Sequence, residues 1–269
     1  MSATAPLAAF VDGVGVLGPG LSDWPAAARV LRGEASWQST PTVLPVPQCL
    51  PPAERRRTGA PVRLTLAVGL EATAQARADP ARLPAVFTSS GGDGQNCHEI
   101  CQALASSDRQ LSPTRFHNSV HNAAAGYWSI ATAATAASNA LCAYDASFAA
   151  GLLEAIAQLA VDRTAVLLIA YDTSYPEPLS RARPISDAFG VALVLSPERG
   201  AASLAQLSAA PVTGPADYMA DARLESLRRS VPAARSLPLL ALLARGTCGR
   251  VAIEYLDDTS VTAELSPCR

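Results

Sequence analysis

The feature that most constrains the fold is an apolar helix followed directly by an apolar strand. Residues 146–160 (ASFAAGLLEAIAQLA) have helical spacing, and their only polar members are Ser147, Glu154 and Gln158. Residues 161–172 (VDRTAVLLIAYD) are mostly apolar and predict a strand. A helix without a polar face and a strand without polar alternation are both buried on nearly all sides. The strand must therefore lie inside a sheet, and other structure must cover the helix.

Strands and helices alternate along the rest of the chain. Hydrophobic spacing and glycine turns predict further strands at 8–20, 83–90, 187–200, 250–256 and 259–265. Helices are predicted at 22–32 (with Ser22 as the N-cap), 63–78, 95–106, 120–136, 216–229 and 237–245. The proline-rich residues 41–52 are expected to form an irregular surface loop. This alternation predicts an α/β fold with helix-covered sheets, in a single domain spanning residues 1–269.

Composition and charge limit the classes of function. Of the 269 residues, 49% are hydrophobic and 16% charged, which excludes disorder and predicts a large core. The net charge is −2 and the only basic cluster is Arg55-Arg56-Arg57, so we expect no nucleic-acid partner. The six cysteines are irregularly spaced and the N-terminus has no leader-like run, which favours the reducing cytoplasm. The longest apolar run, Leu237 to Ala244, is too short to span a bilayer, so we expect no membrane association.

Two motifs invite a ligand-binding interpretation that their spacing does not support. SSGGDG at 89–94 follows a strand and precedes a helix, but it lacks the G-x-G-x-x-G spacing and a following lysine. We interpret it as a turn with Asp93 near the start of the helix. Cys97, His98 and Cys101 resemble part of a zinc site, but a structural zinc site needs four ligands and no second pair is present. We expect both cysteines to face the core, and we expect no metal.

The remaining chemistry lies at the start of the apolar helix and in a histidine pair. Oriented amides at a buried helix N-terminus stabilise an anion, so Asp145 is expected to be buried there as an N-cap. Cys142 lies three residues upstream, at the end of the preceding strand. Cys142 with His117 or His121 as base is an alternative, although no local spacing favours it. Hydrogen bonding of these histidines in a loop or an interface is the simpler interpretation.

Several segments, taken in order, resemble β-ketoacyl synthases. Residues 10–33 (FVDGVGVLGPGLSDWPAAARVLRG) resemble the opening of such an enzyme, with a strand, a Gly-Val-Gly turn and a helix. Residues 112–131 are similar to the segment that carries an Asn-x-x-x-Gly run, here from Asn122 to Gly126. Residues 148–172 resemble the nucleophile helix and its following strand, and 189–205 a later strand and turn. The resemblance implies a thiolase-like layered α-β-α-β-α fold, truncated to mainly the N-terminal half of a ketosynthase.

The resemblance also implies that the catalytic groups are missing. Counting without a gap from Gly126, the catalytic cysteine position falls on Asp145, and a carboxylate does not form the usual thioester. The family's two catalytic histidines lie in its C-terminal half, whereas this chain has no histidine after residue 205. The pattern is similar to chain-length factors, particularly the truncated type of aryl polyene systems. Such a subunit is non-catalytic, pairs with an active β-ketoacyl synthase and shapes its acyl tunnel.

By the same resemblance, the segment from Phe116 to Tyr127 lies near the partner interface and the tunnel end. Its candidate residues are Phe116, His117, Asn118, His121, Asn122, Gly126 and Tyr127. Phe116 is the candidate chain-length stop, with a plain core position as the alternative. The implied partners are an active ketosynthase and, through the complex, an acyl carrier protein, with no cofactor. A free-standing acyltransferase using Cys142, a scaffold that only binds the carrier protein, and a homodimer of the isolated chain stay open.

Overall fold

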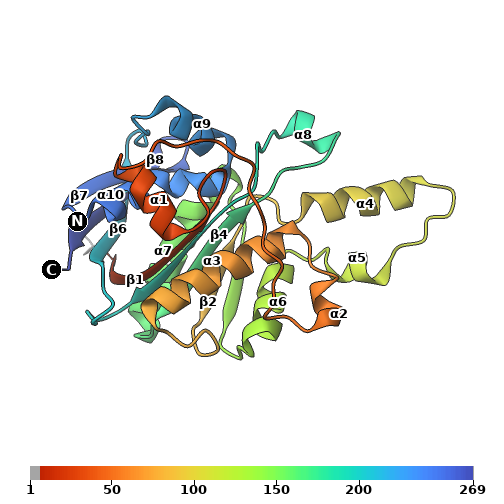
Figure 1. Ribbon diagram of the computed structural model, residues 1–269, viewed down its shortest axis with the longest axis horizontal. Coiled ribbons are helices and arrows are strands. Elements are labelled where there is room, and N and C mark those ends of the chain that lie inside the picture. The colour runs from red at the N-terminus through yellow and green to blue at the C-terminus, as the bar shows by residue number, and fades with distance from the viewer. Residues whose placement is uncertain (1–6, 269) are drawn as a thin grey trace.

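The computed structural model describes residues 7–268 and is built on one eight-stranded mixed sheet (Figure 1). Its strands, in the spatial order β3-β2-β4-β5-β1-β6-β8-β7, leave β3 and β7 at the two edges. They are β1 (Leu7–Leu17), β2 (Ala85–Thr88), β3 (Ser138–Leu141), β4 (Val166–Asp172), β5 (Phe189–Ser196), β6 (Ala205–Thr213), β7 (Gly249–Leu256) and β8 (Thr259–Pro267). β2 is parallel to β3 and to β4, and the other neighbouring pairs are antiparallel. The carboxyl ends of β2, β3 and β4 therefore meet at one end of the sheet.

Helices cover both faces of this sheet and create two separate hydrophobic cores. On one face lie α3 (Ala60–Ala76) and α6 (Ala123–Thr132); on the other lie α1 (Trp24–Leu31), α7 (Ser147–Asp162), α9 (Ala222–Ser230) and α10 (Leu237–Arg245). Successive strand side chains point to opposite faces. Accordingly Val86 packs in the core with α7, whereas its neighbour Phe87 packs in the core with α3 and α6.

Shorter helices lie in the connections. These are α2 (Pro52–Arg55), α4 (Gly94–Ala105), α5 (Pro113–His117) and α8 (Leu179–Ala182), with the 3₁₀ turns η1 (Tyr144–Ala146) and η2 (Pro232–Ser236). Figure 1 shows α4 extending away from the body of the molecule, with α5 returning along the chain beside it. This arm leaves the fold after β2, next to the edge strand β3.

The Gly-Val-Gly run is not the expected turn, because Gly13 and Gly15 lie within β1, where they have a packing function. A Cβ atom on Gly13 would lie 2.1 Å from the carbonyl oxygen of Ala72, and one on Gly15 would lie 2.0 Å from that of Val68. Both carbonyls belong to α3, so β1 approaches this helix more closely than any side chain would permit. The two glycines therefore set the distance between the central strand and the helix that covers it.

The predicted α/β fold class is confirmed, because helices cover both faces of one mixed sheet. The described residues form one sheet between two helical layers, which is three of the five layers expected. The buried helix is confirmed, because residues 147–160 are all buried or half-buried. The buried strand is confirmed over β4 alone, since residues 161–162 end α7 and residues 161–164 are exposed. Asp93 lies at the start of α4 as expected, where its carboxylate accepts a hydrogen bond from the amide of Asn96.

Other details of the predicted fold are incomplete or wrong. The strand β6 was not predicted, although it pairs with both β1 and β8. Ser22 does not cap α1; the cap is Asp23, whose carboxylate accepts a hydrogen bond of 2.7 Å from the amide of Ala26. Cys97 and Cys101 do not face the core, since both are exposed on α4.

Candidate functional site

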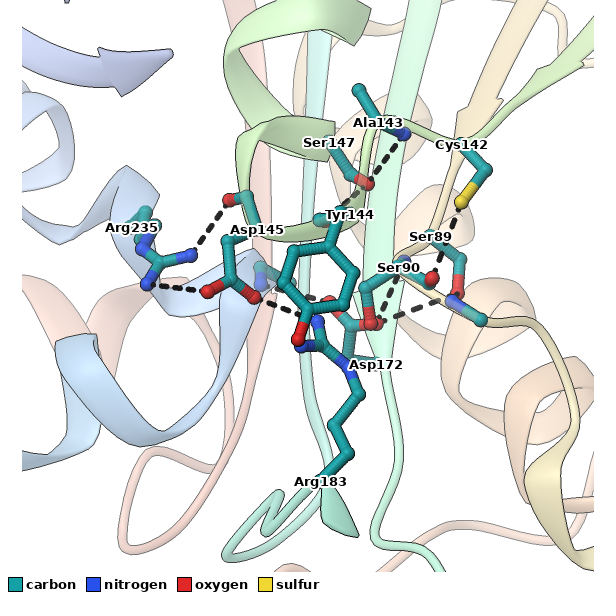
Figure 2. A network of polar contacts seen from close by, with 12 residues as sticks. Ser89, Ser90, Cys142, Ala143, Tyr144, Asp145, Ser147, Asp172, Arg183 and Arg235 are labelled. Atoms are coloured by element: carbon teal, nitrogen blue, oxygen red, sulfur yellow. Dashed lines mark hydrogen bonds and ion pairs between the residues drawn. The ribbon is translucent and has the colours of Figure 1, made fainter. Parts of the chain in front are cut away.

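A polar site lies where the carboxyl ends of the parallel strands meet the start of α7 (Figure 2). Ser89 and Ser90 follow β2, Cys142 follows β3, and Asp172 is the last residue of β4. η1 then leads directly into α7 and carries Asp145. In open α/β sheets ligands bind beyond the carboxyl ends of the strands, so this is where chemistry is expected.

Two arginines hold the carboxylate of Asp145. Arg183 donates from Nη2 to Oδ1 at 2.6 Å, and Arg235 donates from Nη2 to Oδ2 at 3.1 Å. Arg235 also donates from Nη1 to the backbone carbonyl of Asp145 at 2.8 Å. The guanidinium of Arg183 lies 3.6 Å from the centre of the Tyr144 ring, which is a cation–π contact. Through these contacts with Tyr144 and Asp145, Arg183 holds its segment of the chain against the start of α7.

The electrostatic environment keeps Asp145 ionised. Burial acts to raise the pKa of its carboxyl, but the hydrogen bonds from Arg235 and Arg183 outweigh this effect and the pKa is lowered. The side chain is 38% exposed, so the expectation of a buried carboxylate is wrong. The expectation of an N-cap is wrong as well, because no side chain caps η1 or α7. Ser147 instead accepts a hydrogen bond from the amide of Ala143.

Asp172 is a second acidic residue of the site, and it is buried. Its Oδ1 accepts from the amide and the hydroxyl of Ser90, at 2.9 and 2.6 Å, and its Oδ2 accepts from the amide of Ala233 at 2.9 Å. Burial raises the pKa of Asp172 to about 6, against the opposing effect of these hydrogen bonds. Its carboxyl ties together the ends of β2 and β4 and the turn η2.

The structure does not join Cys142 to a histidine. The Cys142 thiol is exposed and donates to the carbonyl of Ser90 at 3.2 Å. His121 Nε2 lies 3.0 Å from the carbonyl oxygen of Leu141, and the His117 ring packs edge-on against Tyr127. Across residues 7–268, no histidine nitrogen hydrogen bonds with Cys142. The geometry therefore gives no support to a Cys–His pair.

Five of the seven candidate interface residues line an open groove of about 540 Å³ beside α5 and α6, whereas Asn118 and His121 lie outside it. The groove is lined by Pro113, Phe116, His117, Val120, Asn122, Ala123, Gly126, Tyr127 and Ile130. Phe116 is 67% exposed, so the alternative that it belongs to the core is wrong. Asn118 is buried below the groove, where it donates to the carbonyl of Arg57 and accepts from the Tyr127 hydroxyl. Asn118 thereby holds in place Tyr127, which lines the groove.

The site contains functional side chains that the sequence did not indicate. Arg183 and Arg235 reach Asp145 from 38 and 90 positions along the chain, and no local motif marks either residue. Asp172 is the last residue of the strand predicted at 161–172, and nothing in its local sequence indicates a function. In the described part of the chain, no group of three or more His, Cys, Asp or Glu side chains is placed to hold a metal ion. None of its helices is both long and apolar enough to cross a membrane.

The sequence and the fold were compared with known proteins. Residues 24–246 match the family described as the N-terminal domain of β-ketoacyl synthases. Among curated proteins, none matches this sequence. Many solved structures do match.

One of these is a ketosynthase (ApeO) in complex with its chain length factor (ApeC) from Xenorhabdus doucetiae. It has 25% sequence identity and a TM-score of 0.73, and the match covers 96% of this chain and 99% of that one. A type II polyketide acyl-carrier protein in complex with its ketosynthase gives a TM-score of 0.76 at 14% identity, covering 98% and 100%. The ishigamide ketosynthase/chain length factor gives 0.70 at 15%, with the same coverage. The last two likenesses concern the fold alone.

Proposed function

Because the chain belongs to the family of β-ketoacyl synthase N-terminal domains, we propose that it is a non-catalytic subunit of the chain-length-factor type. It pairs with an active β-ketoacyl synthase and shapes the tunnel in which that enzyme's acyl chain grows. The chain acts as a single domain over residues 1–269. Aryl polyene biosynthesis in the cytoplasm is the proposed setting, with an acyl carrier protein reaching the subunit through the complex and with no cofactor.

The observation that carries this proposal is the state of Asp145. By the count from Gly126, this residue stands where a condensing enzyme has its nucleophilic cysteine. Two guanidinium groups hold its carboxylate as an anion, with a lowered pKa. An ionised carboxylate in two ion pairs is a poor nucleophile towards a thioester. Arg183 also occupies the space next to the Tyr144 ring. On this proposal, charge pairing takes the place of the family's chemistry at this position.

The neighbouring structures support a ketosynthase partner. The match to a chain of the ketosynthase and chain length factor complex covers nearly all of this protein and nearly all of that chain, at 25% identity. The groove beside α5 and α6 supplies an exposed apolar surface for such a partner, with Phe116 at its rim. An exposed phenylalanine at the end of a tunnel would limit how far an acyl chain extends. This is the basis for proposing Phe116 as the chain-length stop.

Co-expression with the ketosynthase encoded beside this chain tests the proposal. We expect the two proteins to elute together from a sizing column as a heterodimer. Separate elution, or elution of this chain as a homodimer that excludes the synthase, would contradict it. Within the complex, Phe116→Ala is expected to lengthen the product, as read by mass spectrometry of the carrier-bound chain. An unchanged product length would leave a scaffold that only binds the carrier protein as the better account.

A cysteine substitution separates this function from the acyltransferase alternative. Cys142→Ser is expected to leave the product and its rate of formation unchanged in the complex, because the Cys142 thiol hydrogen bonds to a backbone carbonyl and a serine hydroxyl can do the same. The isolated chain is expected to acquire no mass at Cys142 after incubation with an acyl thioester. An acyl adduct on Cys142, together with loss of turnover in the serine variant, would favour the free-standing acyltransferase.

A further inference from the structure

Helix α4 carries two thiols one turn apart on its exposed side. Cys97 and Cys101 are four positions apart, a spacing that places side chains on the same helix face. Both cysteines are free and exposed, and only Gly94 and Asn96 of this helix are buried. Free cysteines in proteins are usually buried as small hydrophobic residues. Packing therefore does not explain why this helix has a cysteine at both positions.

The two thiols are close enough along the helix to affect each other's ionisation. Partial burial raises the pKa of the Cys97 thiol, and the neighbouring Cys101 raises it further. Neither cysteine belongs to the Asp145 site or lines the groove beside α5 and α6. The pair is thus a separate dithiol on the arm that extends from the body of the molecule (Figure 1).

A disulfide does not fit this spacing. Side chains four apart on a helix have Cβ atoms about 5–6 Å apart. A disulfide requires a Cβ separation of about 3.5–4.5 Å. Oxidation of the pair would therefore distort α4, whereas an ion placed between the two sulfur atoms spans the longer gap with the helix intact.

The number and type of donors select the ion. Zinc in structural sites takes four protein ligands, and the described residues provide no group of three or more suitable side chains. Soft thiolate ligands select Cu(I) among the metals that do not need such a full set. We propose that Cys97 and Cys101 form a two-thiolate binding site for a soft monovalent cation of the Cu(I) type. Binding replaces the two S–H bonds by two Cu–S bonds and releases two protons, with no change of oxidation state.

A competition titration tests this site on the full chain. The reduced protein is titrated anaerobically with Cu(I) in the presence of bicinchoninate, a coloured Cu(I) chelator. We expect the wild type to withhold one more equivalent of copper from the chelator than Cys97→Ser/Cys101→Ser does. Each single substitution should weaken that binding by about tenfold or more, because one thiolate replaces a chelating pair. The matched control is Cys142→Ser, which removes another exposed thiol and should leave the titration unchanged.

A second measurement on the wild type keeps the proposal testable if the double variant folds poorly. Phenylarsine oxide condenses with two neighbouring thiols, forming two As–S bonds and releasing water. The tryptic fragment 83–109 contains Cys97 and Cys101 and no other cysteine. We expect one bridged phenylarsenic group on this fragment. Equal copper retention by the wild type and the double variant, or a fragment 83–109 without the bridge, would overturn the proposal. Both results are independent of whether the chain pairs with a ketosynthase.

Discussion

At the scale of single residues, the carboxylate of Asp145 forms ion pairs with two arginines, Arg183 and Arg235. The Arg235 side chain is only 8% exposed and has Glu254 as its other anionic partner, at 2.9 Å. Asp145→Ala leaves this guanidinium with one carboxylate. Since Asp145 itself is 38% exposed, solvent screening reduces the loss, and we expect the free energy of unfolding to fall by about 1–2 kcal/mol.

Chemical denaturation measures this loss, and an exposed aspartate provides the control. Asp108 has no hydrogen bond or ion pair with any other residue in 7–268. Asp108→Ala should therefore change the unfolding free energy by less than about 0.5 kcal/mol. Equal effects of the two substitutions would show that the ion pairs of Asp145 contribute nothing to stability.

Asp172 makes stability depend on pH in the opposite sense to an ion-paired carboxylate. Its folded-state pKa of about 6 lies above the value of about 3.9 for an unfolded aspartate, so the folded state binds more protons between these values. The contribution of Asp172 is present below about pH 4 and is lost as the pH rises through about 6. This loss amounts to as much as roughly 3 kcal/mol.

The measurement is a series of denaturation curves between pH 4 and 8 for the wild type and Asp172→Asn. Their difference isolates this group, because the other carboxyls titrate in both proteins. We expect the wild type to lose stability relative to the variant between about pH 4 and pH 6, and the difference to level off above the folded-state pKa. A flat difference, or a ¹³C titration of the Asp172 carboxyl centred near pH 4, would contradict the expectation.

The Asp145 site was only partly predictable from the sequence, because some of its residues are distant from one another along the chain. The position of Asp145 followed from counting along one continuous segment, and that segment folds as expected. Arg183 and Arg235 are 38 and 90 positions away, and only the tertiary fold brings them to the carboxylate. The N-cap prediction failed for the same reason, because a local rule took no account of the two distant guanidinium groups that pair with this carboxylate.

At the scale of elements, the helices α6 and α7 contain glycines in contrasting surroundings. A Cβ on Gly151 in α7 would lie 2.7 Å from Thr88 Cγ2, whereas a Cβ on Gly126 in α6 has no atom within 4 Å. Gly151→Ala should destabilise the chain by about 1–3 kcal/mol through overpacking. Gly126→Ala should raise the stability by up to about 1 kcal/mol through helix propensity.

Thermal unfolding compares these two variants, and binding separates packing from recognition. Gly126 lines the groove beside α5 and α6. If the partner seats there, Gly126→Ala stabilises the isolated chain and weakens the complex at the same time. A variant that is more stable and binds the ketosynthase as well as the wild type would place the contact elsewhere. Stabilisation by Gly151→Ala would contradict the close packing of α7 on β2.

Elements with a strong hydrophobic pattern were predictable, and those with small residues were not. β4 and α7 are nearly all apolar, and both occur where they were predicted, except that β4 begins at Val166 and α7 continues to Asp162. β6 buries mainly Ala205, Leu207 and Ala209, and it contains Pro211. Alanine gives little hydrophobic contrast and proline argues against a strand. β6 is stabilised instead by pairing with β1 and β8. Both strands are distant from it in the sequence, so no local pattern reveals the pairing.

At the scale of the whole molecule, the apolar groove and the arm of α4 and α5 lie on the side of the sheet whose edge strand is β3. Phe116, Val120 and Ile130 all line this groove, and all three are exposed. Exposed apolar side chains that cluster around a groove are typical of an interaction surface. A partner seated there would cover them and the β3 edge together.

This arrangement predicts that Phe116→Glu affects assembly and not folding. Because the side chain is 67% exposed, the unfolding free energy of the isolated chain should change by less than about 0.5 kcal/mol. In the complex a buried carboxylate would replace an aromatic contact, so affinity for the ketosynthase should fall by about tenfold or more. The matched control is Val161→Glu at the far end of α7, where the valine is 80% exposed and outside the groove. Equal affinities of the two variants, measured by titration calorimetry, would show that the partner does not cover Phe116.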